Sequence, residues 1–232
     1  MKLIANFKQN GNLNGLSDWF SSFVSELGDV GSIAGHLEII LLPSLHLLVP
    51  FKNLIDGSSL SLVIKVGVQN VSRFKNGAHT GEVGAGQLEG LAEYALLGHS
   101  ERMSEGETTV NVVEKVTRTL DSSIKPIVCF GDLDDFSKYS EYKQKVEFVY
   151  EPPNAISTYS GSDKRNAADL AELESVFEQI GLNGIIYGGS VNDENIVDYL
   201  GVKYLKGFLV GSACLNPNKF ARIARILCSG NR

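Results

Sequence analysis

Short apolar segments recur along the chain, separated by longer stretches that mix apolar and polar residues. The apolar segments are rich in leucine and β-branched residues, and most of them lack the alternation of a strand that faces water on one side. Continuous runs of this kind are typical of parallel strands covered by helices. The pattern predicts eight strands, at residues 3–7, 37–42, 62–68, 94–98, 124–130, 146–150, 184–188 and 205–211.

Helical periodicity is clearest in two of the intervening stretches. The first has apolar residues three or four positions apart, at Leu16, Trp19, Phe20, Phe23 and Leu27. The second repeats this spacing at Leu170, Leu173, Phe177 and Ile180, with Gly181 as the expected C-cap. Eight strands alternating with helices favour a closed (β/α)8 barrel over an open doubly wound sheet, which usually has about five or six strands. We see no linker-like tract, so we expect residues 1–232 to form one domain.

Charge and composition exclude some classes of partner. The formal net charge is −6 and the sequence pI is about 5.3. The chain therefore lacks the general basic character that a protein needs to bind nucleic acids or anionic membranes. The first ten residues contain no secretory apolar region, and no apolar run is long enough to span a membrane. Cys129, Cys214 and Cys228 are odd in number and lack metal-like spacing. We therefore expect reduced thiols in a cytoplasmic protein.

Polar residues follow several of the predicted strands directly. Lys8 comes after the first strand, His99 after the fourth and Glu151 after the sixth. In a parallel barrel, the residues just after each strand line one rim, where ligands bind. The glycine-containing turns "YGGSVN" and "VGSA" follow strands seven and eight and would lie beside these side chains.

These residue types together indicate a particular chemistry. Glu151 lies between Tyr150 and two prolines, a setting that suits a general base. If His99 begins a helix, the helix dipole disfavours its charged form, so a neutral ring can donate to a carbonyl. Lys8 supplies positive charge, and the glycine turns offer backbone N–H groups to a phosphate. The combination suggests proton abstraction next to a carbonyl in a phosphorylated substrate.

Each of these features also has an ordinary structural interpretation. A glutamate beside proline is most often a loop carboxylate, and Gly-Gly pairs mark turns more often than anion sites. We favour a structural ion pair between Glu101 and Arg102 over a direct chemical role. Cys129, at a strand end, is interpreted as a buried small apolar residue and not as a nucleophile. The functional signal lies in the conjunction of polar residues at the rim.

The ordered motifs resemble the triosephosphate isomerase family over nearly the whole chain. The start is similar to that family's Asn-Trp-Lys-x-Asn-Gly motif, with Phe7 in place of Trp. Five further segments resemble its third loop, its two catalytic signatures and its phosphate-binding turns: "QNVSRFKNGAHTGEV", "LLGHSER", "YEP", "YGGSV" and "FLVGSA".

The resemblance implies a TIM barrel and a set of roles. Glu151 would be the base, His99 the neutral electrophile and Lys8 the substrate-binding cation, with Asn6 orienting the substrate. The implied reaction interconverts dihydroxyacetone phosphate and D-glyceraldehyde 3-phosphate through an enediolate, in glycolysis and gluconeogenesis, with no metal or organic cofactor. Backbone N–H groups near four residues would hold the phosphate: Ser157, Ser190, Gly211 and Ser212.

The sequence departs from the family's pattern in the lid and in the fifth helix. The segment after Glu151 reads "PPNAISTYSG", with Asn154, Ser157 and Tyr159 where the family has a Trp and two glycines. Only residues 133–145 remain for the fifth helix, so we expect it to be shortened.

The loop from Gln69 to Gly86 is long for a connection between strand and helix. In the resembled family it inserts into a second subunit, which implies a homodimer with Thr80 near Asn6 and Glu101 of the partner copy. The alternative is a self-packed loop on a monomer.

Two other functions compete with the isomerase. One is a phosphate-binding barrel that has lost catalysis. The other is a sugar-phosphate lyase or epimerase, which would usually need metal ligands or a Schiff-base lysine on a late strand. Lys206 is the only lysine in strand eight, and the sequence shows no acid or base partner for it.

Overall fold

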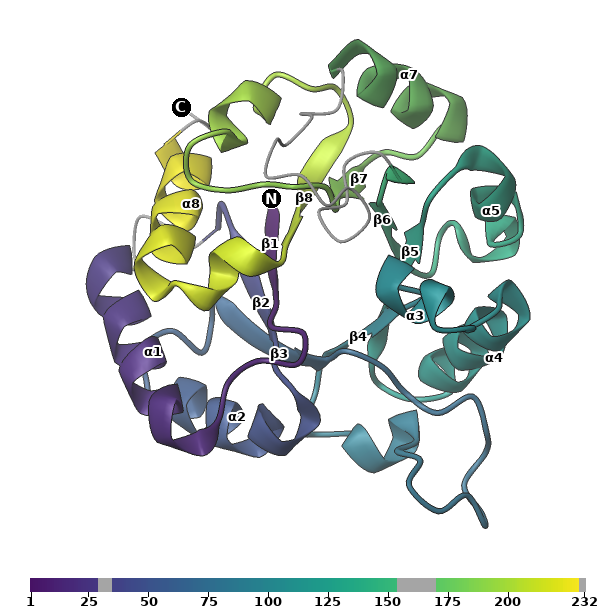
Figure 1. Cartoon of the computed structure of the whole chain (residues 1–232), viewed down its shortest axis with the longest axis horizontal. Helices are drawn as coiled ribbons and strands as arrows, with labels where there is room; N and C mark the ends of the chain where they lie inside the picture. Colours follow the sequence, from purple (N-terminus) through teal and green to yellow (C-terminus); the bar gives the residue numbers. More distant parts are fainter. Residues whose placement is uncertain (29–34, 154–169, 230–232) are drawn as a thin grey trace.

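Eight parallel strands close into a barrel in chain order, from β1 to β8 and back to β1. The computed structural model describes residues 1–28, 35–153 and 170–229. Figure 1 shows the helices arranged around the strands, with β1 and β8 side by side. The strands are Lys2–Asn6 (β1), Glu38–Leu42 (β2), Ile64–Val68 (β3), Tyr94–Leu97 (β4), Lys125–Phe130 (β5), Glu147–Tyr150 (β6), Ile185–Tyr187 (β7) and Leu205–Val210 (β8).

The described α-helices lie outside this barrel. They are Leu13–Leu27 (α1), Leu48–Asp56 (α2), Ser100–Ser104 (α3), Thr109–Leu120 (α4), Leu133–Ser137 (α5), Leu170–Ile180 (α7) and Pro217–Ser229 (α8). Short 3-10 helices lie in the connections at Leu45–Leu47 (η2), Ala85–Leu88 (η3), Ser140–Tyr142 (η4), Ile196–Tyr199 (η6) and Ser212–Leu215 (η7).

All eight predicted strands are confirmed, with ends that differ by one or two residues. Burial on both sides explains their continuous apolar sequence. In β1, Ile4 belongs to the cluster inside the barrel, while its neighbours Leu3 and Ala5 belong to the layer between strands and helices. All three side chains are fully buried. Successive strand residues point to opposite faces, so an apolar residue is favoured at every position.

The two helices predicted from periodicity are also confirmed. In α1 the Asn12 side chain accepts a hydrogen bond from Gly15 N, and Phe20 and Phe23 are buried. In α7, Gly181 ends the helix with φ of +66° and donates its N–H to Phe177 O. Leu170 is an exception to the expected apolar stripe, because it is the first described residue of α7 and is 37% exposed.

The shortened fifth helix is present as predicted. α5 has 5 residues and begins where the Asp132 side chain accepts from Asp135 N at 2.7 Å. Its buried Phe136 packs at 5.0 Å, between ring centroids, from both Phe130 of β5 and Phe148 of β6. One aromatic residue therefore lets a very short helix cover two strands.

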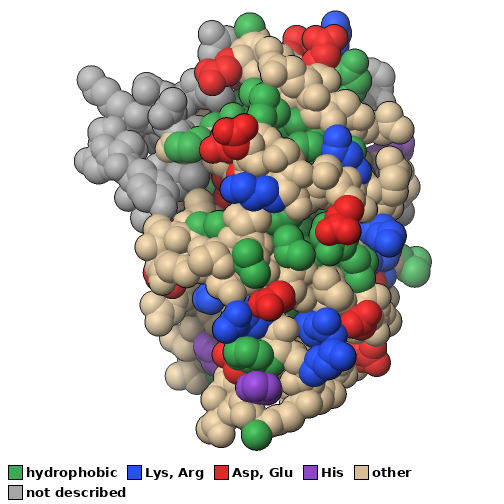
Figure 2. All heavy atoms as spheres, turned by 90° about the vertical axis from the view of Figure 1, so that its right-hand side faces the viewer, with side chains coloured by type: hydrophobic (Ala, Val, Ile, Leu, Met, Phe, Trp, Pro, Cys, Tyr) green, Lys and Arg blue, Asp and Glu red, His purple; other side chains and the backbone are tan. Residues whose placement is uncertain are grey.

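The surface beside α4 and α5 carries mixed charge, with Lys, Arg, Asp and Glu interspersed in Figure 2. No helix within the described ranges has both the length and the apolar character needed to span a membrane. The interpretation of residues 1–232 as one domain stays a prediction.

Two valines of α4 offer a matched test of this packing. Val112 is fully buried and Val110 is 67% exposed. We expect Val112→Ala to lower the free energy of unfolding by about 2 kcal/mol, because it removes two buried methyl groups and leaves a cavity. Val110→Ala should change it by less than about 0.5 kcal/mol. Equal losses in urea titrations of the two variants would contradict the placement of α4.

Candidate active site

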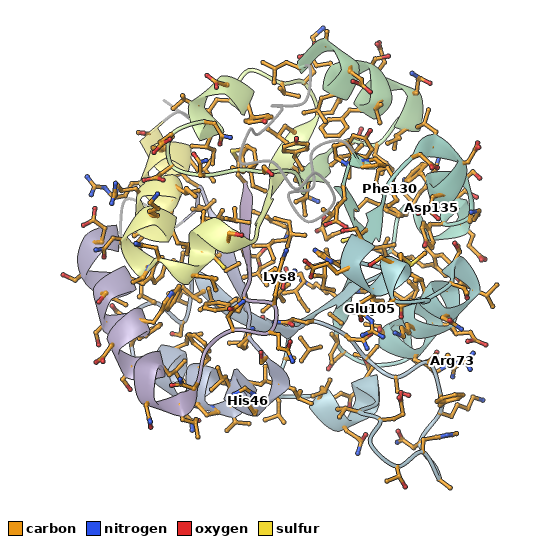
Figure 3. The ribbon with its side chains drawn as sticks, viewed as in Figure 1. Lys8, His46, Arg73, Glu105, Phe130 and Asp135 are labelled. Atoms are coloured by element: carbon orange, nitrogen blue, oxygen red, sulfur yellow. The ribbon has the colours of Figure 1, made fainter. Side chains whose placement is uncertain are left out.

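Lys8 lies at the rim in a strained conformation. Its φ of +52° is in the left-handed region, which costs a non-glycine residue roughly 1–2 kcal/mol. Three hydrogen bonds hold it there: Lys8 N donates to Asn6 Oδ1 at 3.1 Å, and Lys8 O accepts from Ser44 Oγ and Gln69 Nε2, each at 2.9 Å. Figure 3 shows Lys8 near the centre of the ring of strands. These contacts direct the Lys8 side chain over the barrel.

His99 follows β4 and caps the N-terminus of α3. Its Nδ1 accepts a hydrogen bond from Glu101 N at 3.2 Å. A ring nitrogen that accepts from a backbone N–H carries no proton, so the geometry assigns the proton of a neutral ring to Nε2. That nitrogen lies 3.1 Å from Glu151 Oε1. The prediction that His99 stands at the start of a helix is confirmed.

Glu151 is a buried carboxylate, 4% exposed, directly after β6. Its Oε2 accepts from Ser100 N at 2.9 Å. Gly188 after β7 makes room for it, since a Cβ at that position would lie 2.8 Å from Glu151 Cγ. Burial, together with the nearby Glu151 carboxylate, raises the pKa of the Cys129 thiol well above its ordinary value. Cys129 is thus buried, as the sequence predicted, and its protonated thiol is a poor nucleophile.

Glu101 joins this group through Lys8. Its Oε1 lies 2.6 Å from Lys8 Nζ, and its Oε2 lies 3.8 Å from His99 Nδ1. The predicted ion pair between Glu101 and Arg102 is wrong, because Arg102 points to Glu107, with Nε 3.4 Å from Oε2. Consecutive residues of a helix diverge by about 100° around its axis, so the two side chains of this pair reach different partners.

The glycine turn after β8 lies against Lys8. A Cβ on Gly211 would be 3.2 Å from Lys8 Cε, so the bare backbone lets the lysine side chain approach. Ser212 is exposed at the start of η7, and Ser190 in the turn after β7 accepts from Asn195 Nδ2 through its carbonyl at 2.9 Å. Ser157, like Asn154 and Tyr159, lies outside the described residues.

Thr80 is not part of this group. It lies in the exposed stretch 73–82 of the long loop, which projects away from the barrel in Figure 1. Among the described residues, no cluster of three or more His, Cys, Asp or Glu side chains is arranged to hold a metal ion.

Lys206 does have an acidic partner, contrary to the sequence interpretation. Its Nζ donates to Glu147 Oε2 at 2.6 Å. Glu147 and Lys206 belong to the beginnings of β6 and β8, whereas Lys8, His99 and Glu151 follow strand ends. Lys206 therefore lies at the opposite end of the barrel from Lys8, His99 and Glu151. A Schiff-base lysine of a lyase would have to lie beside those residues.

Sequence reasoning missed two residues that support the site. Gln69 counted only as the start of a long loop, yet its Nε2 donates to both Lys8 O and Leu42 O at 2.9 Å. Cys129 counted as core, yet it lies beside Glu151. Gln69 is a polar residue directly after an apolar strand, and this is the same feature by which His99 was selected. The sequence could therefore have indicated Gln69 as a rim residue. A buried cysteine in a strand gave no signal.

Comparison with known proteins places the chain among homologues. A sequence model of a family described as triosephosphate isomerase matches residues 1–227. Triosephosphate isomerase of Polynucleobacter asymbioticus is 32% identical over 96% of this chain and 98% of its own length. The enzymes of that name from Wolbachia pipientis and Aquifex aeolicus are 30% and 27% identical, each over 95% of this chain and 91% and 97% of their own lengths. The rim geometry and these matches agree, and the chain belongs to the triosephosphate isomerase family.

Proposed function

We propose that this chain is a triosephosphate isomerase, which interconverts dihydroxyacetone phosphate and D-glyceraldehyde 3-phosphate by proton transfer through an enediolate. The observation that carries the proposal is the contact of Glu151 with His99 beside Lys8, at one rim of the barrel. The activity belongs to glycolysis and gluconeogenesis and uses no metal or organic cofactor.

Glu151 acts as the base. Burial keeps water from competing for its carboxylate, and the hydrogen bond from Ser100 N fixes one of the two oxygens. The other oxygen, Oε1, lies against His99 Nε2. A substrate carbonyl that takes the hydrogen bond of His99 releases Oε1 to remove a proton from the adjacent carbon.

His99 and Lys8 stabilise the negative oxygen that this step creates. The backbone N–H of Glu101 donates a hydrogen bond to His99 Nδ1, so Nε2 is the ring nitrogen that can donate to the substrate. Lys8 contributes a fixed positive charge, and the bound dianion competes with Glu101 for it. Asn6 orients the substrate, and backbone N–H groups near Ser157, Ser190, Gly211 and Ser212 hold the phosphate.

The first test shortens the base. We expect Glu151→Asp to fold normally and to lower kcat by about 10²-fold, because a displacement near 1 Å at the reacting carbon has an effect of this size. Glu147→Asp is the matched control on the same strand, at the other end of the barrel, and should leave kcat unchanged. Steady-state assays with glyceraldehyde 3-phosphate, with and without a chelator, measure both. An unchanged kcat in Glu151→Asp would remove Glu151 from the mechanism.

A second test separates the two groups that face the oxygens. His99→Gln should lower kcat by about 10²-fold with little change in the binding of phosphate-bearing inhibitors, because its contact strengthens mainly in the transition state. Lys8→Met should weaken those inhibitors as well, because its charge attracts the dianion before reaction. Normal inhibitor binding by Lys8→Met, measured by calorimetry, would contradict the charge argument.

The long loop supports a homodimer as part of this proposal. Phe74 is 37% exposed on the projecting stretch and stacks on His79 at 4.2 Å, with Arg73 4.6 Å from its ring centre. A preorganised aromatic cluster exposed on a loop is suited to burial against a second copy. Thr80 would then lie next to Asn6 and Glu101 of that copy.

The dimer is tested by shortening the loop. Replacing residues 74–81 by a two-glycine linker should give monomers of low activity in sedimentation velocity experiments. Leu62→Asp, at a hydrophobic residue that is 87% exposed elsewhere, is the control and should stay dimeric. A fully active monomer of the loop-shortened protein would contradict the proposal that this loop completes the active site of a second copy.

A cytoplasmic location completes the proposal. Cys129, Cys214 and Cys228 are all free thiols, and the first two are buried. Burial also raises the pKa of the Cys214 thiol, which keeps it protonated and unreactive. Free cysteines of this kind are typical of reducing compartments.

A further inference from the structure

A second polar site lies at the opposite end of the barrel. A hollow of about 330 Å³ opens where β5, β6 and β8 begin, beside the turn that follows α7. Its charged lining consists of Lys125, Lys143, Lys145, Lys206 and Glu147. We call it the lysine hollow. It shares no lining residue with the group around Lys8 and Glu151.

The lysine hollow has a charge opposite to that of the whole chain. Four lysines and one glutamate leave an excess of three positive charges at its wall, in a protein of formal net charge −6. Like charges that line one hollow repel one another, and an anion bound between them would relieve this repulsion.

The single glutamate of the hollow is already paired with two lysines. Glu147 Oε2 accepts from Lys206 Nζ at 2.6 Å, and its Oε1 lies 3.6 Å from Lys2 Nζ. Two lysines thus share one carboxylate. Its negative charge is not available to the other lysines of the hollow.

Two of the three remaining lysines contact aromatic rings. Lys125 Nζ lies 5.6 Å from the centre of the Tyr94 ring, and Lys143 Nζ lies 5.0 Å from that of Phe136. These contacts position an ammonium group without neutralising it. Within the described part of the chain, Lys125, Lys143 and Lys145 form no ion pair with a carboxylate.

The shortened fifth helix builds one wall of the hollow. α5 ends at Ser137 and η4 at Tyr142, and the chain then enters β6 through residues 143–146, which all line the hollow. Because so few residues separate α5 from β6, Lys143 and Lys145 lie at the barrel's end and not on a helix flank. The hollow is therefore linked to the feature in which this chain is shorter than its fold usually requires.

We infer that the lysine hollow binds a small multivalent anion of the oligophosphate class. Its volume is within the range of small-molecule sites, and three unpaired ammonium groups match a ligand with several charged oxygens better than a single monovalent ion. This site is independent of the isomerase reaction, because it lies at the other end of the barrel.

The test is calorimetry with inorganic tripolyphosphate at an ionic strength of about 0.1 M, where distant charges are screened. We expect one site per chain outside the active site, retained in Lys8→Met. The double variant Lys143→Gln/Lys145→Gln should bind about tenfold more weakly, because two of the charges that face the anion are lost. Its kcat for isomerisation should equal that of the unmodified protein.

The control removes the same number of charges elsewhere. Lys75→Gln/Lys203→Gln alters two exposed lysines that do not line the hollow and should change the affinity by less than about twofold. Equal weakening in the two double variants, or loss of binding in Lys8→Met, would overturn the inference. So would the absence of binding, or binding of an oligoglutamate peptide in place of tripolyphosphate, which would assign the hollow to an acidic protein segment. If Lys143→Gln/Lys145→Gln unfolds, Lys125→Gln is used in its place. It removes one positive charge from the hollow, and its affinity for tripolyphosphate is compared with that of the unmodified protein.

Discussion

Closure of the barrel is the constraint on which the other features depend. Eight strands that pair in parallel, in chain order, must all end at one rim and all begin at the other. Segments far apart in the sequence, such as those of Lys8 and Gly211, are therefore brought into contact. The same closure buries both faces of every strand, so polar side chains collect at the two ends.

At one end, the fold stabilises an arrangement that would be unfavourable in isolation. Lys8 has left-handed backbone geometry, and the hydrogen bonds from Ser44 and Gln69 compensate for its strain. Glu151 is a buried carboxylate, and Ser100 N and His99 satisfy its oxygens. Strain and buried charge persist only where the surroundings hold them, and both are common at functional sites.

At the other end, ion pairs close the interior of the barrel. Lys2 contacts Glu38 and Tyr94 Oη, and Glu147 joins Lys2 to Lys206. Lys125, Lys143 and Lys145 do not belong to this network, and they line the hollow beside the short connection between α5 and β6. The two ends thus differ in their chemistry. One brings a buried carboxylate, an imidazole and a lysine together, and the other gathers several lysines.

The sequence by itself determined the strands, the barrel and the types of residue at the rim, because apolar continuity and strand order are local and repeated properties. It also determined the short fifth helix, since too few residues separate β5 from β6 for a longer one. Only the tertiary structure decided the partners: Glu101 with Lys8, Arg102 with Glu107, Lys206 with Glu147, and Gln69 with the backbone of Lys8. Side-chain pairing depends on distances between segments that are remote in the chain, and closure of the barrel sets those distances.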